Sequence, residues 1–210
     1  MSALLWKVCG ITRGEDAEEA VRLGAGAIGF ILWPGSPRAI SVEAAAAIGR
    51  DLPDGVQKVG VFVDPDADEL RGAAEEAGLD VVQLSGDESP ALCSQAPKPA
   101  WKALRLPSGT STTEAEEMAA PYDGCTLLVD AGVRGEYGGT GEVADWSAAA
   151  SLAATRRVVL AGGLRPDNVA AAIERVRPWG IDVASGVEAA PGRKDPEKLR
   201  RFAEALEAYR

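Results

Sequence analysis

The sequence contains no histidine among its 210 residues. This absence excludes catalytic arrangements that use a histidine base, and it excludes zinc or iron sites built from imidazole ligands. Any proton transfer in this protein must therefore be carried out by aspartate, glutamate, cysteine, lysine or tyrosine side chains.

Cysteine is also scarce, with three residues in the chain and no CxxC pair. These features disfavour a disulfide framework and a thiolate-bound metal, so we expect no metal site and a cytoplasmic protein. No apolar run is long enough for a membrane helix, and the N-terminus lacks a basic segment followed by an apolar one. We therefore expect neither a membrane span nor a signal peptide.

Positive charge is in deficit, because the formal net charge of the chain is −10. An acidic surface opposes nonspecific binding to nucleic acid and to anionic membranes. The charged residues are interspersed along the chain, which is typical of a solvated surface. A small-molecule partner is therefore expected, and neither a nucleic acid nor a membrane.

Short apolar segments alternate with Ala/Glu/Arg-rich segments along the whole chain. The apolar segments are rich in Val, Ile and Leu and mostly lack polar alternation, as parallel strands buried on both faces do. These strands are expected at residues 4–10, 27–32, 57–63, 80–84, 101–106, 125–130, 156–163 and 180–186. The segments between and after them have helical spacing and are expected to be helices.

Eight such units predict an α/β protein with the (β/α)8 TIM-barrel fold, and an open doubly wound sheet is the alternative. No Pro/Gly-rich linker divides the chain, so residues 1–210 are expected to form a single domain. In such a barrel the chemistry lies at the carboxyl ends of the strands. The polar and glycine residues at these ends are Cys9, the segment 33–38, Asp64, Ser85, Asp130, Gly162, Gly163, Ser185 and Gly186.

Glycine-bearing loops follow the last two predicted strands. Gly162 and Gly163 follow the seventh strand and precede a helix expected to start at Pro166, and Ser185 and Gly186 follow the eighth. Glycine lets backbone N–H groups approach an anion, and these two loops form the usual phosphate site of this fold. The loops are therefore predicted to bind phosphate; the alternative is that their glycines only form tight turns.

Asp130 ends the sixth predicted strand, and the next helix is expected to begin only near residues 145–146. Asp130 lies too early to cap that helix, which favours a functional role. The glycine-rich loop after it, which contains Gly139, could close over a ligand and exclude water. The alternative for this loop is a simple connector.

Arg38 follows the second strand in the segment "WPGSPRAIS", whose two prolines stiffen the loop. A guanidinium held there can bind a carboxylate through two parallel hydrogen bonds. A surface arginine without a ligand is the alternative.

Cys9 ends the first strand, and Lys7 precedes it by two residues, so both side chains are expected on the same side of that strand. A neighbouring ammonium lowers the pKa of a thiol and favours the thiolate. Two alternatives stay open: Cys9 could be buried and inert, and Lys7 could be a structural charge paired with Asp182.

Several segments together resemble one enzyme family. The segments "KVCGIT", "GFILWPGSPRAIS", "VGVFV", "VVQL", "LLVD", "GGTG", "AGGLRPDNV" and "DVASGVEAAPGRKD" resemble those of phosphoribosylanthranilate isomerases in order and spacing, over essentially the whole chain. The resemblance implies a cofactor-free barrel that converts N-(5-phosphoribosyl)anthranilate to a 1-deoxyribulose 5-phosphate by an Amadori rearrangement, in tryptophan biosynthesis.

The resemblance also implies roles for individual residues. Cys9 is similar to the family's general base, and Asp130 is similar to its general acid. Arg38 resembles the arginine that holds the anthranilate carboxylate, and the two glycine loops match the phosphate-binding loops. The chain departs from the family at Ser85, where "VQLSG" replaces the common "VQLHG"; we expect this change to affect binding rather than chemistry.

Two other functions fit part of the sequence. A different phosphosugar barrel enzyme is one. A synthase would need a catalytic Lys-Glu pair at the strand ends, which the sequence does not show, and a metal-dependent epimerase would need histidine ligands, which the chain lacks. A noncatalytic phosphate-binding barrel is the other, and it would need neither Cys9 nor Asp130. Both a monomer and a homodimer are compatible with the sequence.

Overall fold

Eight parallel strands close into a barrel in the computed structural model, which describes residues 4–106, 109–130 and 146–209. The strands are β1 (Leu5–Cys9), β2 (Ala27–Ile31), β3 (Gln57–Phe62), β4 (Val81–Leu84), β5 (Ala100–Arg105), β6 (Thr126–Asp130), β7 (Val158–Leu160) and β8 (Gly180–Val183). They follow one another around the barrel in chain order, and β8 pairs with β1. This last pairing confirms the predicted barrel over the open sheet.

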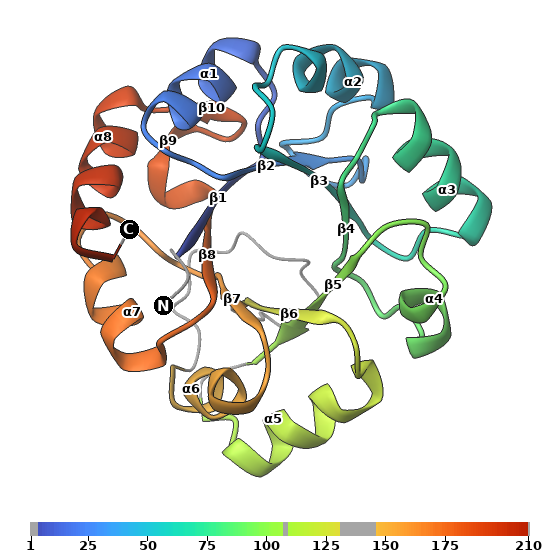
Figure 1. Ribbon diagram of the computed structural model, residues 1–210, viewed down its shortest axis with the longest axis vertical. Coiled ribbons are helices and arrows are strands. Elements are labelled where there is room, and N and C mark those ends of the chain that lie inside the picture. Colours follow the sequence, from blue (N-terminus) through green and yellow to red (C-terminus); the bar gives the residue numbers. More distant parts are fainter. Residues whose placement is uncertain (1–3, 107–108, 131–145, 210) are drawn as a thin grey trace.

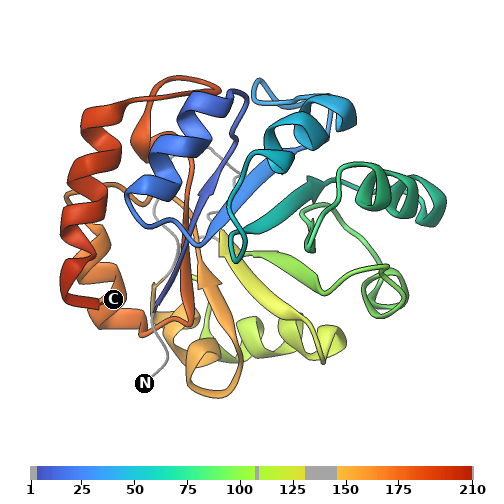
Figure 2. The same ribbon diagram turned by 45° about the horizontal axis from the view of Figure 1, so that its top comes forward.

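Helices surround the barrel as an outer ring (Figure 1). They are α1 (Gly14–Arg22), α2 (Val42–Arg50), α3 (Ala67–Glu76), α4 (Pro90–Ser94), α5 (Thr112–Ala119), α6 (Trp146–Thr155), α7 (Val169–Val176) and α8 (Pro196–Ala205). Figure 2 shows the same ring tilted so that its top comes forward, with α1 (blue) and α8 (red) adjacent at one flank. Within the described part of the chain, no helix has the length and apolar character needed to cross a membrane.

Short elements supplement the eight units. They are the 3-10 turns η1 (Ala120–Tyr122), η2 (Ser185–Val187) and η3 (Glu207–Tyr209), and the strands β9 (Glu188–Ala190) and β10 (Arg193–Lys194). The antiparallel pair of β9 and β10 lies between η2 and α8 and was not expected from the sequence. Its two strands have three and two residues, which is too short to show a strand periodicity in the sequence.

Local sequence signals account for many helix ends. The Ser41 hydroxyl accepts a hydrogen bond from the Ala44 backbone N–H at 3.2 Å and caps α2. Gly24 and Gly78 follow α1 and α3 with φ of 99° and 58°, a backbone conformation that favours glycine. The expected start of α7 at Pro166 is wrong, because residues 166–168 form a turn and the helix begins at Val169.

The protein has two apolar cores because the barrel strands bury both faces. The outer core lies between strands and helices, and there Trp6 of β1 stacks on Phe202 of α8 with ring centroids 5.7 Å apart. The inner core fills the barrel with Ala27, Val59, Val81, Trp101, Ala103, Leu128, Val159 and Ala161. The carboxyl end of the barrel interior instead holds polar side chains, and this is where a site can form.

Two glycines provide a matched test of the packing of β3 against Leu79, which follows α3. A Cβ on Gly60 would lie 2.3 Å from Cδ1 of Leu79, whereas a Cβ on Gly72 of α3 would meet nothing within 4 Å. We expect Gly60→Ala to lower the free energy of unfolding by about 1–3 kcal/mol, because the added methyl overpacks the interface. Gly72→Ala should raise it by about 0.5–1 kcal/mol through helix propensity. Urea unfolding measures both, and equal effects of the two substitutions would contradict this account.

Candidate active site

A cleft opens at the carboxyl ends of the strands. The predicted residues Cys9, Arg38, Asp130 and Asp182 all line it, and Ser85 does as well. Cys9 and Asp130 enter from β1 and β6, which are separated by β7 and β8 around the barrel. The structure therefore brings the acid and base candidates to one cavity from different parts of its wall.

Lys7 lies beneath this cleft with a side chain that is 0% exposed. Its Nζ donates a hydrogen bond to Oδ1 of Asp182 at 3.0 Å, because Lys7 and Asp182 are direct neighbours across the β1–β8 pair. A Cβ added to Gly29 would lie 2.8 Å from Sγ of Cys9 and 2.9 Å from Nζ of Lys7. The prediction that Lys7 lies on the same side of the strand as Cys9 is confirmed, and the alternative in which Lys7 pairs with Asp182 is also observed.

The electrostatics of Cys9 differ from the sequence-based expectation. Burial raises the pKa of the Cys9 thiol, and the Lys7 ammonium opposes this rise without cancelling it. Burial also acts to lower the pKa of Lys7, but Asp182 and Cys9 outweigh it and leave that pKa raised. Lys7 thus favours the Cys9 thiolate, while burial disfavours it.

Arg38 reaches the cleft from the loop after β2 and packs directly on Gly10. Gly10 has φ of 71°, and a Cβ there would lie 2.7 Å from Cδ of Arg38. The Arg38 guanidinium donates from Nε and Nη2 to the two carboxylate oxygens of Glu188, at 2.9 Å and 2.8 Å. The glycine after Cys9 therefore makes room for the arginine that lies beside the thiol.

Asp130 is the last residue of β6 and pairs in register with Arg105, the last residue of β5. Both side chains line the cleft, so a carboxylate and a guanidinium are neighbours on this wall. Gln83 of β4 also lines it, and its Nε2 donates to Oγ of Ser85 at 3.1 Å. Ser85 thus lies at the cleft wall, where the family's histidine is expected.

The glycine loops after β7 and β8 contact each other. Ala184 of the second loop lines the cleft, whereas the described lining does not include Gly162, Gly163, Ser185 or Gly186. Gly162 and Gly163 have φ of 85° and 65°, and a Cβ on Gly186 would lie 1.8 Å from the carbonyl oxygen of Leu164. Asn168 braces the first loop by donating from Nδ2 to the carbonyl oxygen of Gly163 at 3.0 Å. The predicted phosphate loops therefore approach each other so closely that a side chain on Gly186 would collide with backbone.

Gly139, the remaining predicted site residue, lies outside the described residues.

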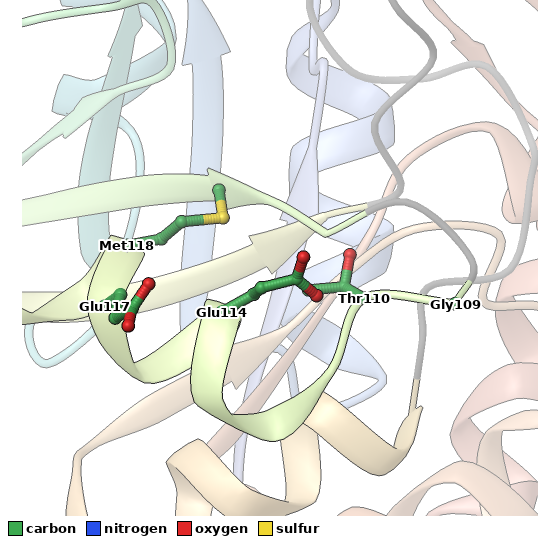
Figure 3. Close-up of a pocket in the computed structure, with 5 residues that line it drawn as sticks. All are labelled: Gly109, Thr110, Glu114, Glu117 and Met118. Carbon is green, nitrogen blue, oxygen red and sulfur yellow. The ribbon is translucent and has the colours of Figure 1, made fainter.

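Another hollow occurs on α5, lined by Gly109, Thr110, Glu114, Glu117 and Met118 (Figure 3). It presents two carboxylates, and Glu114 already bonds Ser111 at the start of α5. Such a surface is unsuited to an anionic ligand. In the described part of the chain, no cluster of His, Cys, Asp and Glu is placed to hold a metal ion.

The structure adds site residues that the sequence did not single out. Glu188 and Lys194 are 6% and 3% exposed and form a salt bridge with each other. Glu188 also accepts a hydrogen bond from Arg38, and Lys194 also donates one to the backbone carbonyl of Cys9. Both residues belong to the segment "SGVEAAPGRKD". The sequence of this segment did not indicate that its acidic and basic side chains would be buried. Gln83 carried a usable signal, because it is a polar residue within an apolar strand.

Comparison with known proteins assigns the chain to one family. Residues 6–205 match the family described as N-(5'-phosphoribosyl)anthranilate (PRA) isomerase. The enzyme of that name from Citrifermentans bemidjiense is 50% identical over 196 residues, which cover 93% of each chain.

Solved structures with the same fold and similar sequence extend this finding. Phosphoribosyl anthranilate isomerase from Thermus thermophilus is 42% identical with a TM-score of 0.87, over 99% of this chain and 100% of that one. A second structure of such an enzyme, in complex with reduced 1-(o-carboxyphenylamino)-1-deoxyribulose 5-phosphate, is 36% identical with a TM-score of 0.85. It covers 98% of this chain and 99% of its own.

Thiol titration tests the electrostatics of Cys9. In the ligand-free protein, the thiolate absorbance that is lost in Cys9→Ser should titrate above about pH 8.5, the ordinary thiol value, because burial disfavours the anion. Lys7→Met should move this titration to still higher pH, since the ammonium that favours the thiolate is removed.

Cys125 is the internal control for this measurement. Its pKa is lowered to about 7 by the hydrogen bond from Cys93, so the absorbance lost in Cys125→Ser should titrate there. A Cys9 titration at or below that of Cys125 would contradict the dominance of burial.

Proposed function

The chain belongs to the N-(5'-phosphoribosyl)anthranilate isomerase family and catalyses this isomerisation in tryptophan biosynthesis, and we propose that Cys9 is its general base and Asp130 its general acid. One observation carries the assignment of roles. Cys9, Asp130 and Arg38 line a single cleft at the carboxyl ends of the strands, in a chain without histidine. An acid, a base and a carboxylate-binding group are what the rearrangement requires.

The proposed reaction begins with two proton transfers. Asp130 in its protonated form donates a proton to the ribose ring oxygen, which opens the ring and leaves a Schiff base between C1 and the anthranilate nitrogen. The Cys9 thiolate then removes the proton from C2, which gives an enolamine. The enolamine becomes the ketone when C1 gains a proton and the C2 hydroxyl loses its own, so that the acid and the base return to their starting states. Each of these general acid–base steps typically contributes about 100- to 10,000-fold in rate.

The two ends of the substrate are proposed to bind at different strand ends. Arg38 binds the anthranilate carboxylate, and the loops of Gly162, Gly163, Ser185 and Gly186 bind the phosphate. The supporting observations are the guanidinium at the cleft wall and the close approach of the two glycine loops. Anchoring both ends fixes the ribose between acid and base, which reduces the entropic cost of the reaction.

Local charge is suited to an anionic substrate even though the chain as a whole is acidic. Lys7, Arg38 and Lys194 provide three positive charges around Cys9, and Asp182 and Glu188 provide two negative ones. The remaining positive charge can be matched by the Cys9 thiolate or by the substrate carboxylate. A noncatalytic phosphate-binding barrel would have no use for this arrangement.

The oligomeric state and the cytoplasmic location stay predictions.

Substitution of the two proposed catalytic residues tests this mechanism. Cys9→Ala and Asp130→Asn should each lower kcat by at least about 100-fold, because each removes a general acid–base step. The measurement is the loss of phosphoribosylanthranilate fluorescence, with circular dichroism as the check that the fold is intact. Cys125→Ala and the exposed Asp68→Asn are matched controls and should keep wild-type turnover. Near wild-type turnover in either active-site variant would refute the assignment.

Arg38→Ala tests the carboxylate contact separately. Its effect should appear mainly as a KM raised by about 10-fold or more, because Arg38 binds the substrate without taking part in proton transfer. An unchanged KM would argue against the contact.

A further inference from the structure

We propose that Glu188 and Lys194 form a buried positioning pair that sets the Arg38 guanidinium and the Cys9 backbone relative to each other before the substrate arrives. The inference rests on the roles proposed above for Arg38 and Cys9. Neither member of the pair contacts the reacting atoms; both act through their partners.

The β9–β10 hairpin brings the pair together. Glu188 and Lys194 are cross-strand neighbours in it. The hairpin is bound to the start of the chain, since the Lys194 backbone N–H donates to Oδ2 of the buried Asp16 at 2.9 Å, and the Thr12 hydroxyl donates to the carbonyl oxygen of Gly192. The pair is therefore held against the segment that follows Cys9.

Glu188 is a carboxylate shared between two cations. Its Oε1 accepts from Arg38 Nε and from Lys194 Nζ, each at 2.9 Å, and its Oε2 accepts from Arg38 Nη2 at 2.8 Å. Burial acts to raise the pKa of Glu188, but Arg38 and Lys194 outweigh it and leave the pKa lowered. Glu188 is therefore ionised at neutral pH and binds the guanidinium without a substrate.

Lys194 extends this contact to the general base. Its Nζ donates to the carbonyl oxygens of Cys9 at 2.6 Å and Ala184 at 3.3 Å, in addition to Glu188. These three acceptors match the three protons of an ammonium. One buried charge thus joins the end of β1, the end of β8 and the carboxylate that holds Arg38.

The geometry leaves one edge of Arg38 for the substrate. Within the described residues, its side-chain hydrogen bonds use Nε and Nη2, so the end formed by Nη1 and Nη2 can face a carboxylate. A guanidinium already fixed in one orientation loses less freedom on binding a ligand, and that preorganisation increases affinity. Glu188 is thus expected to increase affinity for a carboxylate although it is itself negative.

Glu188→Gln separates positioning from simple neutralisation of charge. The probes are reduced 1-(o-carboxyphenylamino)-1-deoxyribulose 5-phosphate and the same compound without its carboxyl group, with binding measured by calorimetry. Glu188→Gln should reduce the preference for the carboxyl compound by about 10-fold and leave affinity for the carboxyl-free compound within about 2-fold of wild type. Tighter binding of the carboxyl compound would overturn the inference, because Glu188 would then only weaken Arg38.

Lys194→Met tests the connection to Cys9. Glu188→Gln should raise KM with kcat within about 3-fold of wild type, whereas Lys194→Met should lower kcat by about 10-fold or more, because the Cys9 carbonyl loses its anchor. Equal effects of the two substitutions on kcat would contradict separate actions of the pair on its two partners.

Arg38→Ala distinguishes failure of this inference from failure of the proposed function. If Arg38→Ala leaves the preference for the carboxyl compound intact, the proposed role of Arg38 is wrong. If Arg38→Ala abolishes that preference and Glu188→Gln does not change it, only the positioning role is wrong.

A measurement on the wild-type protein covers the case in which a variant fails to fold. The Nε–H of Arg38, assigned by NMR through its loss in Arg38→Lys, should exchange with water at least about 10-fold more slowly than that of Arg71, because a buried charge-assisted bond protects it. Arg71 is 56% exposed on α3 and serves as the matched control. Equal exchange rates in the ligand-free protein would overturn the inference.

Discussion

The pairing of β1 with β8 is the constraint on which the rest of the structure depends. It closes the barrel, and at that seam Lys7 and Asp182 face each other in register with a hydrogen bond of 3.0 Å. Two buried charges are costly unless they are paired and hydrogen-bonded, so this contact requires that the seam form in one register. The same register places Cys9 at the rim, two residues beyond Lys7 and on the same side of β1.

The cleft combines burial with charge compensation. Burial disfavours the Cys9 thiolate, whereas the nearby positive charges of Lys7, Arg38 and Lys194 favour it. The carboxylates of Asp182 and Glu188 form ion pairs with these cations and hold them in place. An acidic protein thereby presents a locally positive site to a substrate that carries a phosphate and a carboxylate. The Cys-Gly pair at the end of β1 serves both needs, since Cys9 supplies the thiol and Gly10 leaves space for Arg38.

Much of the site could be predicted from strand ends. The barrel rule brings residues that are far apart in the chain to one rim, so Cys9, Arg38 and Asp130 could be selected once the eight strands were recognised. Glu188 and Lys194 could not, because charged residues in a short polar segment are usually solvated. Their burial arises from a hairpin that contacts the loop after β1, and no local pattern predicts that contact.

The amino-acid sequence by itself determined the barrel, its strand order, the absence of histidine chemistry and the family. These properties depend on periodicity and residue identity, which are local or cumulative along the chain. Only the tertiary structure decided that Glu188 holds Arg38, that Lys194 joins it to Cys9, and that burial outweighs Lys7 in setting the thiol pKa. Those outcomes depend on distances and on exclusion of water between segments up to 185 residues apart, and such quantities exist only once the chain has folded.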